Sequence, residues 1–178
     1  MRQYEIYATD IGNTLIAQED EQITNLCPEG AIDLAGMHRE PTPLLKQAIG
    51  GLRAYLDGER GAFASLPLSP NGTGFQKAVW QAILEIPYGQ TASCQQLAEA
   101  IGKPAAAQDV IAAIAENPIF IAIPCHRVDV ADGDFTRSAY GEDVKKKLLA
   151  IEGAPSAPTG SRLWHLRSNF LGRTDRYV

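Results

Sequence analysis

Hydrophobic and polar positions follow two different periods along the chain. Within the first 26 residues, three runs of strand-forming residues, YEIYA, NTLIAQE and QITNL, are separated by turn signals, the first of them at Gly12-Asn13. Between residues 40 and 60, apolar side chains from Leu44 to Leu56 recur at helical spacing. This pattern predicts a small antiparallel sheet with one helix packed on it.

A stretch rich in Pro, Gly, Ser and Asn separates this first part from the rest of the chain. Residues 62–74 contain LPLSPNGTG, a composition typical of a linker. We therefore predict one domain over residues 1–68 and a second domain over residues 69–154. Residues 155–178 show no periodic pattern, and we predict an irregular tail there.

The second part has mainly helical spacing. One helix is predicted over residues 75–86 and another over residues 141–152, which carries a run of three lysines. Between them, residues 119–123 form a short apolar run that is typical of a buried segment. With the sheet of the first part, this arrangement places the chain in the α+β class.

Two further helices are predicted between residues 93 and 116. Ser93 suits the N-cap of a short helix over residues 94–101, and Pro104 suits the first turn of a second helix. Gly102 joins the two, so the pair is a candidate helix-turn-helix with residues 105–115 as its second helix. Any helical hairpin gives the same pattern, and the alternative is two ordinary packed helices.

The charge of the chain is unevenly distributed. A formal net charge of -5 argues against a protein that coats nucleic acid through bulk electrostatics. The first 60 residues carry five basic and ten acidic side chains, whereas the remainder carries eleven of each. The lysine run over residues 145–147 is therefore either a local contact for a phosphate backbone or a solvated helix face.

Nothing in the sequence predicts contact with a membrane. The longest apolar stretches are far shorter than the roughly 20 residues that cross a bilayer. The first residues, MRQYEIYATD, lack the apolar core of a secretory signal. We therefore expect a cytoplasmic protein.

Cys125 beside His126 is the strongest local candidate for chemistry. The three cysteines, Cys27, Cys94 and Cys125, cannot form a disulfide framework. A thiolate is a strong nucleophile, and an imidazole can take the proton of a thiol directly or through one water. Adjacent residues of an extended segment face opposite ways, so direct contact requires a turn, which Pro124 favours. An inert buried cysteine remains the alternative.

Four motifs in a fixed order are more specific than this pair. They are GTGFQKAVW, IPYGQTAS, NPIFIAIPCHRV and LLAIEG. With them, residues 70–153 resemble the O6-alkylguanine-DNA alkyltransferases, also called methylated-DNA-protein-cysteine methyltransferases, and the resemblance extends more loosely over residues 4–68. It implies an N-terminal ribonuclease-H-like antiparallel sheet with a helix. It also implies a C-terminal helical domain whose helix-turn-helix enters the minor groove while the damaged base is flipped out.

The resemblance also implies roles for individual residues. Cys125 matches the alkyl acceptor, His126 a base that acts through water, and Glu152 the carboxylate that orients the histidine. Asn117 matches the turn before the active-site segment and is counted with the catalytic residues, and Arg127 matches a structural partner. Contacts with DNA are expected from Ser93, Cys94, Gln95, Ala106, Gln108 and Arg127, and a pocket for the alkylated base from Ile114, Val128, Ser138 and Ala139.

The implied partner is double-stranded DNA that carries alkylated bases. The resemblance implies no cofactor. We expect no metal either, because no second pair of ligands lies at the spacing of a zinc site. We further expect a monomer.

At three positions the chain departs from the family pattern. Gln108 stands where an arginine usually enters the base stack, and Cys94 stands where a tyrosine usually helps to rotate the phosphate. Ser138 replaces a tyrosine that usually closes the pocket. A thiol is a weak donor and glutamine carries no charge, so these changes should weaken base flipping or departure of the purine. The sequence is therefore interpreted as a divergent member.

Three functions remain open on this evidence. The first is single-use transfer of an alkyl group from O6 of guanine, or from O4 of thymine, to Cys125. The second is an alkyltransferase-like protein that binds lesions in DNA with weak or no transfer. The third is a Cys-His-Glu hydrolase with turnover, for which the sequence shows no exit from a covalent intermediate.

Overall fold

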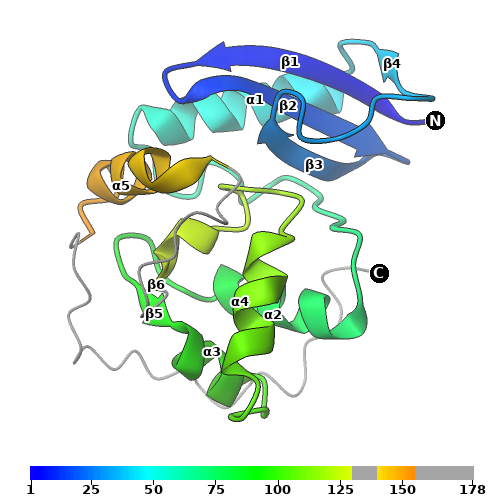
Figure 1. Ribbon diagram of the computed structural model, residues 1–178. Helices are drawn as coiled ribbons and strands as arrows, with labels where there is room; N and C mark the ends of the chain where they lie inside the picture. Colours follow the sequence, from blue (N-terminus) through cyan, green and yellow to red (C-terminus); the bar gives the residue numbers. More distant parts are fainter. Residues whose placement is uncertain (130–139, 155–178) are drawn as a thin grey trace.

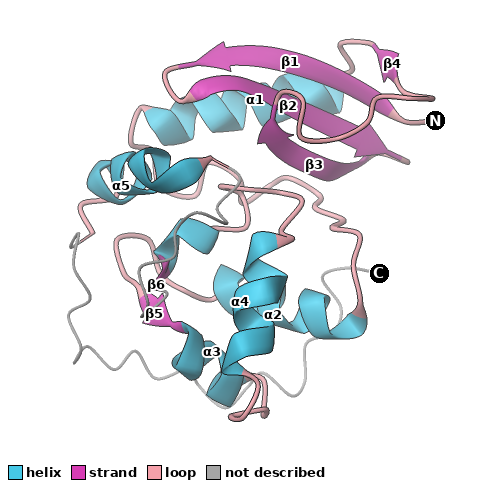
Figure 2. Cartoon of the chain, in the orientation of Figure 1, coloured by secondary structure: helices cyan, strands magenta, loops and turns pink. Residues whose placement is uncertain are grey.

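The four-stranded sheet lies at one end of the molecule and most of the helices lie at the other (Figure 1, Figure 2). The computed structural model describes residues 1–129 and 140–154. Ser138, Ala139 and the predicted tail over residues 155–178 lie outside the described residues. An α+β fold is observed, as the sequence predicts.

The N-terminal sheet is built from the three predicted strands and one more. Strands β1 (Gln3–Thr9), β2 (Gly12–Glu19) and β3 (Gln22–Pro28) form an antiparallel meander. Strand β4 (His38–Arg39) pairs in parallel with β1, which gives the order β3-β2-β1-β4. The sheet is therefore mixed, and the prediction of a purely antiparallel sheet was wrong, because a strand of two residues has no alternation to detect.

Helix α1 (Pro43–Leu56) packs on this sheet, as predicted. It begins at Thr42, whose hydroxyl accepts a hydrogen bond from the backbone N–H of Leu45, and Pro43 suits the first turn because it needs no hydrogen-bond acceptor there. Its buried side chains are Leu45, Ala48, Leu52 and Tyr55. This apolar face of the helix is therefore directed toward the hydrophobic core of the molecule.

The C-terminal part contains four α-helices among the described residues. They are α2 (Gly74–Leu84), α3 (Cys94–Ala100), α4 (Ala107–Ala115) and α5 (Gly141–Ile151). Two short strands, β5 (Ala92–Ser93) and β6 (Val128–Asp129), pair with each other in parallel. The 3-10 helix η1 (Cys125–Arg127) comes directly before β6.

Local capping explains where two of these helices begin. Ser93 is the N-cap of α3, as predicted, and forms a capping box with Gln96. Thr73 forms the same arrangement with Gln76 at α2. Helix α4, however, begins at Ala107 and not at Ala105 as predicted, because the chain first closes a turn in which Ala106 donates its N–H to the Lys103 carbonyl.

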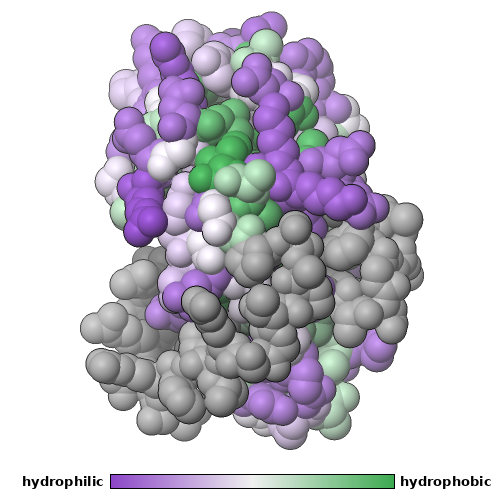
Figure 3. Space-filling model, turned by 90° about the vertical axis from the view of Figure 1, so that its left-hand side faces the viewer, coloured by the Kyte–Doolittle hydropathy of each residue, from purple (hydrophilic) through white to green (hydrophobic). Residues whose placement is uncertain are grey.

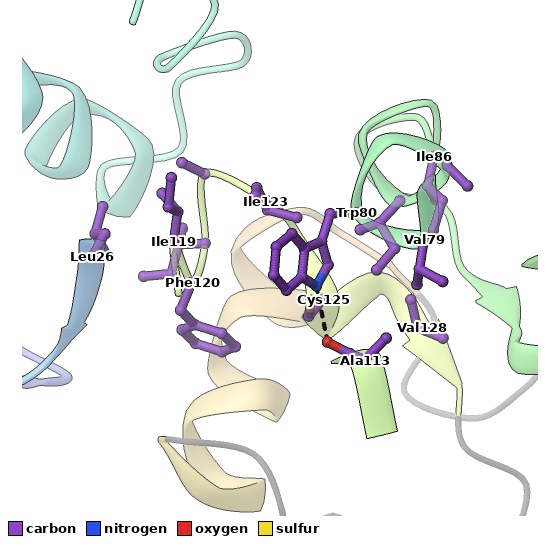
Figure 4. Packing of buried hydrophobic residues seen from close by; sticks show 14 of the residues in the cluster. Leu26, Val79, Trp80, Ile86, Ala113, Ile119, Phe120, Ile123, Cys125 and Val128 are labelled. Carbon is purple, nitrogen blue, oxygen red and sulfur yellow. Dashed lines mark hydrogen bonds between the residues drawn. The ribbon is translucent and has the colours of Figure 1, made fainter. Parts of the chain in front are cut away.

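The two parts of the chain share one hydrophobic core. Leu26 of β3 belongs to the same buried cluster as Val79 and Trp80 of α2, and Figure 4 shows it facing Ile119. The indole N–H of Trp80 donates to the carbonyl of Ala113 at 2.8 Å, which ties α2 to α4. Burial of this cluster therefore holds the sheet, the helices and the segment before Cys125 together.

Strand β3 also holds the segment that leads to Cys125. The N–H of Leu26 donates to the Pro118 carbonyl, and the N–H of Phe120 donates to the Leu26 carbonyl. Ile121 has a φ of 71°, a conformation that a β-branched residue rarely adopts. The predicted buried run over residues 119–123 is confirmed as buried. The two hydrogen bonds to Leu26 fix the start of this segment, which leads into the residues of the site.

The surface offers few large apolar side chains to solvent. Among the described residues, Met1 is the large hydrophobic residue that is exposed. Figure 3 shows one face, on which apolar side chains form a narrow patch in the upper half with hydrophilic side chains on both sides. Within the described ranges, no helix combines the length and the apolar character that crossing a bilayer requires.

Candidate active site

Cys125 lies at the start of η1, in the turn that the sequence predicts after Pro124. Its thiol is buried, and Asn117 donates from Nδ2 to the Cys125 sulfur at 2.9 Å and to the carbonyl of Ile123 at 3.0 Å. The Oδ1 atom of Asn117 accepts the N–H of Ile119 at 3.0 Å. One side chain thus fixes the turn and supplies a donor to the sulfur.

The groups around Cys125 have opposite effects on the pKa of its thiol. Burial raises the pKa of the thiol to about 12, whereas the Asn117 donor and the positive charge of Lys145 act to lower it. A thiol with this pKa is protonated at neutral pH. A nucleophilic reaction at Cys125 therefore needs a group that removes the proton.

Lys145 is buried, although the sequence predicts either a DNA contact or a solvated face for the lysine run. Its ammonium donates to the Val128 carbonyl at 2.6 Å, and burial lowers its pKa. The prediction was wrong for Lys145, because the first lysine of the run falls on the inner face of α5. Lys146 and Lys147 are exposed, as a solvated face requires.

His126 and Glu152, which the family resemblance assigns to the base and to the carboxylate that orients it, form a fully buried pair. The His126 Nε2 atom lies 2.7 Å from Glu152 Oε1, and neither side chain is exposed. Burial raises the pKa of Glu152, but hydrogen bonds from His126, Arg127 and Tyr55 outweigh it and lower the pKa to about 2. The carboxylate is therefore ionised at neutral pH and can only accept hydrogen bonds.

This geometry assigns the proton of the neutral imidazole. Because Glu152 can only accept, Nε2 of His126 carries the proton and donates it to the carboxylate. Nδ1 is then the basic atom, and it is buried with no hydrogen-bond partner among the described residues. Burial lowers the pKa of His126, against the opposing effect of Glu152. The imidazole is thus neutral, with a free lone pair, and lies next to Cys125 in the chain.

The guanidinium of Arg127 forms its hydrogen bonds with groups inside the protein. Its Nε donates to Glu152 Oε2 at 2.9 Å, its Nη2 to Glu152 Oε1 at 3.0 Å and its Nη1 to the Ile86 carbonyl at 2.7 Å. The backbone N–H of Gly89 also donates to Glu152 Oε2, at 3.0 Å. These contacts match the structural role expected of Arg127, and its expected contact with DNA stays a prediction.

Tyr55 of α1 is the member of this network that sequence reasoning missed. Its hydroxyl donates to Glu152 Oε1 at 2.5 Å and lies 2.9 Å from His126 Nε2. The sequence places Tyr55 on the apolar stripe of its helix and gives no signal of a polar partner. The contact spans 97 residues of sequence, so only the folded arrangement of the two parts shows it.

The residues expected to contact DNA lie around α3 and α4. Gln95 and Gln108 are exposed, and Ala106 is half-buried at the start of α4. The Ser93 hydroxyl caps α3. Cys94 is buried, and its thiol lies 3.7 Å from the Asp129 carbonyl. The exposed glutamines can reach a ligand directly, whereas Cys94 needs a movement of its surroundings to do so.

The residues expected to form a base pocket are described only in part. Val128 is buried and Ile114 is half-buried, whereas Ser138 and Ala139 lie outside the described residues. A cavity of about 680 Å³ is lined by Tyr55, Glu85, Arg127 and mostly apolar residues, and neither Ile114 nor Val128 lines it. The base pocket thus stays a prediction. In the described parts of the chain, no cluster of His, Cys, Asp and Glu could hold a metal ion.

Comparison with known protein families covers nearly all of the described chain. Residues 3–70 match the ribonuclease-like domain of 6-O-methylguanine DNA methyltransferase. Residues 74–154 match its DNA-binding domain. The chain belongs to the 6-O-methylguanine DNA methyltransferase family. Its description as a divergent member of that family stays a prediction.

Individual relatives match over most of their length. A methylated-DNA-protein-cysteine methyltransferase of Methanosarcina barkeri is 40% identical over 84% of this chain and 96% of its own. A constitutive methylated-DNA-protein-cysteine methyltransferase of Bacillus subtilis is 38% identical over 85% of this chain and 96% of its own. Members of the family thus resemble this chain in both of its parts.

A solved structure agrees with the fold. The crystal structure of Mycobacterium tuberculosis OGT in complex with DNA superposes with a TM-score of 0.77 at 36% identity. The match covers 86% of this chain and 96% of the other. The arrangement of sheet and helices described above is therefore that of a known member of the 6-O-methylguanine DNA methyltransferase family.

Proposed function

We propose that this chain repairs DNA by moving an alkyl group from O6 of guanine to the sulfur of Cys125, once per molecule. O4 of thymine is a second possible donor of the alkyl group. The family and the names of its relatives support this activity. The observation that carries the assignment is a buried Cys125 with an Asn117 donor at 2.9 Å, followed by a neutral histidine with a free Nδ1.

The reaction begins with removal of the thiol proton. Nδ1 of His126 takes this proton, through one water, and the imidazole becomes positively charged. Glu152 stabilises this charge through the hydrogen bond at 2.7 Å from Nε2. Asn117 donates to the developing thiolate. Each of these residues therefore favours the charged pair more than the neutral one.

The thiolate then attacks the alkyl carbon in line with the bond that breaks. A carbon–sulfur bond forms, the carbon–oxygen bond breaks, and its electron pair stays on the oxygen of the base, which takes up one proton. The net change exchanges a proton and an alkyl group between the cysteine and guanine. The product is a thioether, which water does not readily cleave, so each chain reacts once.

The target base has to leave the stack before this step. An alkyl group on a base edge is out of reach inside a duplex, and extrusion costs a few kcal/mol. We assign this binding to the domain over residues 69–154, through α3 and α4 with Gln95 and Gln108. The domain over residues 1–68 packs against the site and supports it. We propose that the protein acts as a monomer, without cofactor or metal.

The intact mass of the protein after incubation with an oligonucleotide that carries O6-methylguanine tests the proposal. We expect a gain of one methyl group, saturating at one per chain, and peptide mapping should place it on Cys125. The Cys125→Ser variant should gain nothing. Cys27→Ser, the same change at a buried cysteine of β3, is the matched control and should react like the unaltered protein.

Two other results would support the alternatives instead. Binding of the oligonucleotide with an unmodified mass would indicate a lesion-binding protein without transfer. Repair of more than one lesion per chain would indicate a hydrolase with turnover. Methylation of the Cys125→Ser variant to the same extent would contradict the assignment of the acceptor.

A further inference from the structure

The hydroxyl of Tyr55 lies between the two buried groups of the site. It is 2.5 Å from Glu152 Oε1 and 2.9 Å from His126 Nε2, and these two atoms are themselves 2.7 Å apart. Tyr55 comes from α1, which packs on the N-terminal sheet. The proposed chemistry takes place on the other part of the chain, so this contact crosses from one part to the other.

The ionised state of Glu152 assigns the protons in this triangle. Glu152 is ionised and accepts only, so the single proton of the Tyr55 hydroxyl goes to Oε1. Burial and the neighbouring Glu152 raise the pKa of Tyr55, so the hydroxyl keeps this proton. Its oxygen lone pairs then face the N–H at Nε2 of His126. This arrangement excludes the tautomer in which Nε2 is bare, because two acceptors already surround that atom.

The ring of Tyr55 is packed among three other aromatic rings. Its side chain is 3% exposed, and its ring contacts those of Phe63 at 5.7 Å, Tyr88 at 6.4 Å and His126 at 6.1 Å between centroids. The hydroxyl is therefore a fixed point against which the imidazole is aligned. A fixed acceptor beside Nε2 sets both the rotation of the His126 ring and the direction of its Nδ1 lone pair.

We propose that Tyr55 is a positioning residue for alkyl transfer, which keeps His126 in the tautomer with a bare Nδ1 and holds its ring in place. The inference rests on the proposed function, since His126 acts as a base only if Cys125 is the nucleophile. It assigns to the N-terminal part of the chain a direct share in the reaction. That part is then more than a support for the helices.

The Tyr55→Phe variant tests this role, because it removes the hydroxyl and keeps the ring. We expect single-turnover methyl transfer at neutral pH to slow by about tenfold or more, the usual cost of a hydrogen bond to a charged group. Tyr140→Phe is the matched control. That tyrosine is half-buried, and its hydroxyl contacts Thr14 at 3.3 Å, not His126 or Glu152. It should transfer at the unaltered rate.

The pH dependence separates positioning from a general loss of structure. A defect in the base is relieved as hydroxide replaces it, so the deficit of Tyr55→Phe should shrink as the pH rises. A distorted pocket would give a deficit that does not change with pH. The free energy of unfolding, measured for both variants, shows how much stability each lost hydroxyl contributes.

The tautomer can be observed in the unaltered protein by nitrogen-15 NMR of the imidazole. We expect a protonated Nε2 and a bare Nδ1 for His126, and a change of the Nε2–H resonance in Tyr55→Phe but not in Tyr140→Phe. A protonated Nδ1 in the unaltered protein would overturn the proposal, as would equal transfer rates for Tyr55→Phe and the unaltered protein. Absence of transfer in the unaltered protein would instead contradict the proposed function.

Discussion

Three neighbouring features act on the sulfur atom of Cys125. Burial raises its pKa to about 12, and the Asn117 donor and the charge of Lys145 counteract that effect in part. A thiol that stays protonated until a base acts on it is protected from unrelated electrophiles. The buried positive charge of Lys145 therefore acts together with the histidine to favour the thiolate of Cys125.

Replacing Lys145 by methionine should slow methyl transfer. The change removes the positive charge and keeps an unbranched side chain of similar size, so the pKa of Cys125 rises and less thiolate forms at a given pH. A nearby charge is worth on the order of 1 kcal/mol even when well screened, which corresponds to about a fivefold lower rate. The measurement is single-turnover transfer from pH 6 to pH 9.

Lys146→Met provides the control for this prediction. Lys146 is the next residue of the same helix, is exposed and pairs with Glu142 at 2.7 Å. It should react like the unaltered protein at every pH. Equal rates for Lys145→Met and Lys146→Met would show that the buried charge does not influence the thiol.

Individual residues of the site were predictable to different degrees. Cys125, His126, Asn117 and Glu152 lie in motifs whose order identifies the family, and the structure brings all four together. Tyr55 and Lys145 were not found, because an apolar stripe and a lysine run reveal nothing of partners that are distant in sequence. Buried polar contacts depend on tertiary packing, so single-sequence patterns miss them.

At the scale of elements, the features that depend only on residues close together in the sequence were predictable. The N-cap of α3 depends only on Ser93 and its near neighbours, and it lies where the sequence predicts it. Strand β4 and the start of α4 were not predicted correctly. The first has two residues and exists only by pairing with β1, and the second is displaced by a turn closed at Lys103. Both depend on neighbours that a periodic pattern does not include.

Helix α4 carries the element-scale prediction. Gln108 is exposed near its start, and Gln108→Arg should strengthen binding of duplex DNA by about threefold to tenfold and increase its salt dependence, because one more positive charge meets the phosphates. Methyl transfer should accelerate as well if the helix inserts this side chain into the stack. Binding titrations at two salt concentrations and single-turnover rates measure both effects.

A change of the same kind at Gln47 is the control. Gln47 is exposed on α1, in the N-terminal part of the chain. Gln47→Arg adds the same charge and should leave affinity and rate nearly unchanged. If both variants bind DNA equally well, the gain comes from net charge, and α4 has no special place at the DNA.

At the scale of the whole molecule, the hydrophobic core extends across the boundary between the two predicted domains. The large buried cluster includes residues of the sheet, of α1 and of α2. Leu26 of β3 lies near Ile119 (Figure 4), and its backbone forms hydrogen bonds with the segment before Cys125. A second, smaller cluster, with Leu15, Ala17 and Cys27, lies within the sheet. The shared cluster and the Tyr55 contact predict that the two parts unfold together.

Two leucine-to-alanine variants of the sheet test this cooperativity. Leu26→Ala affects the shared cluster and Leu15→Ala affects the smaller one, and both side chains are fully buried. Each change should lower the free energy of unfolding by about 2 to 5 kcal/mol. In a cooperative molecule, Leu15→Ala speeds hydrogen exchange in α2 by the same free energy as in β2, although Leu15 belongs to the smaller cluster of the N-terminal part. Faster exchange confined to β2 would show instead that the N-terminal part opens independently, and Tyr55 could then leave the site without global unfolding.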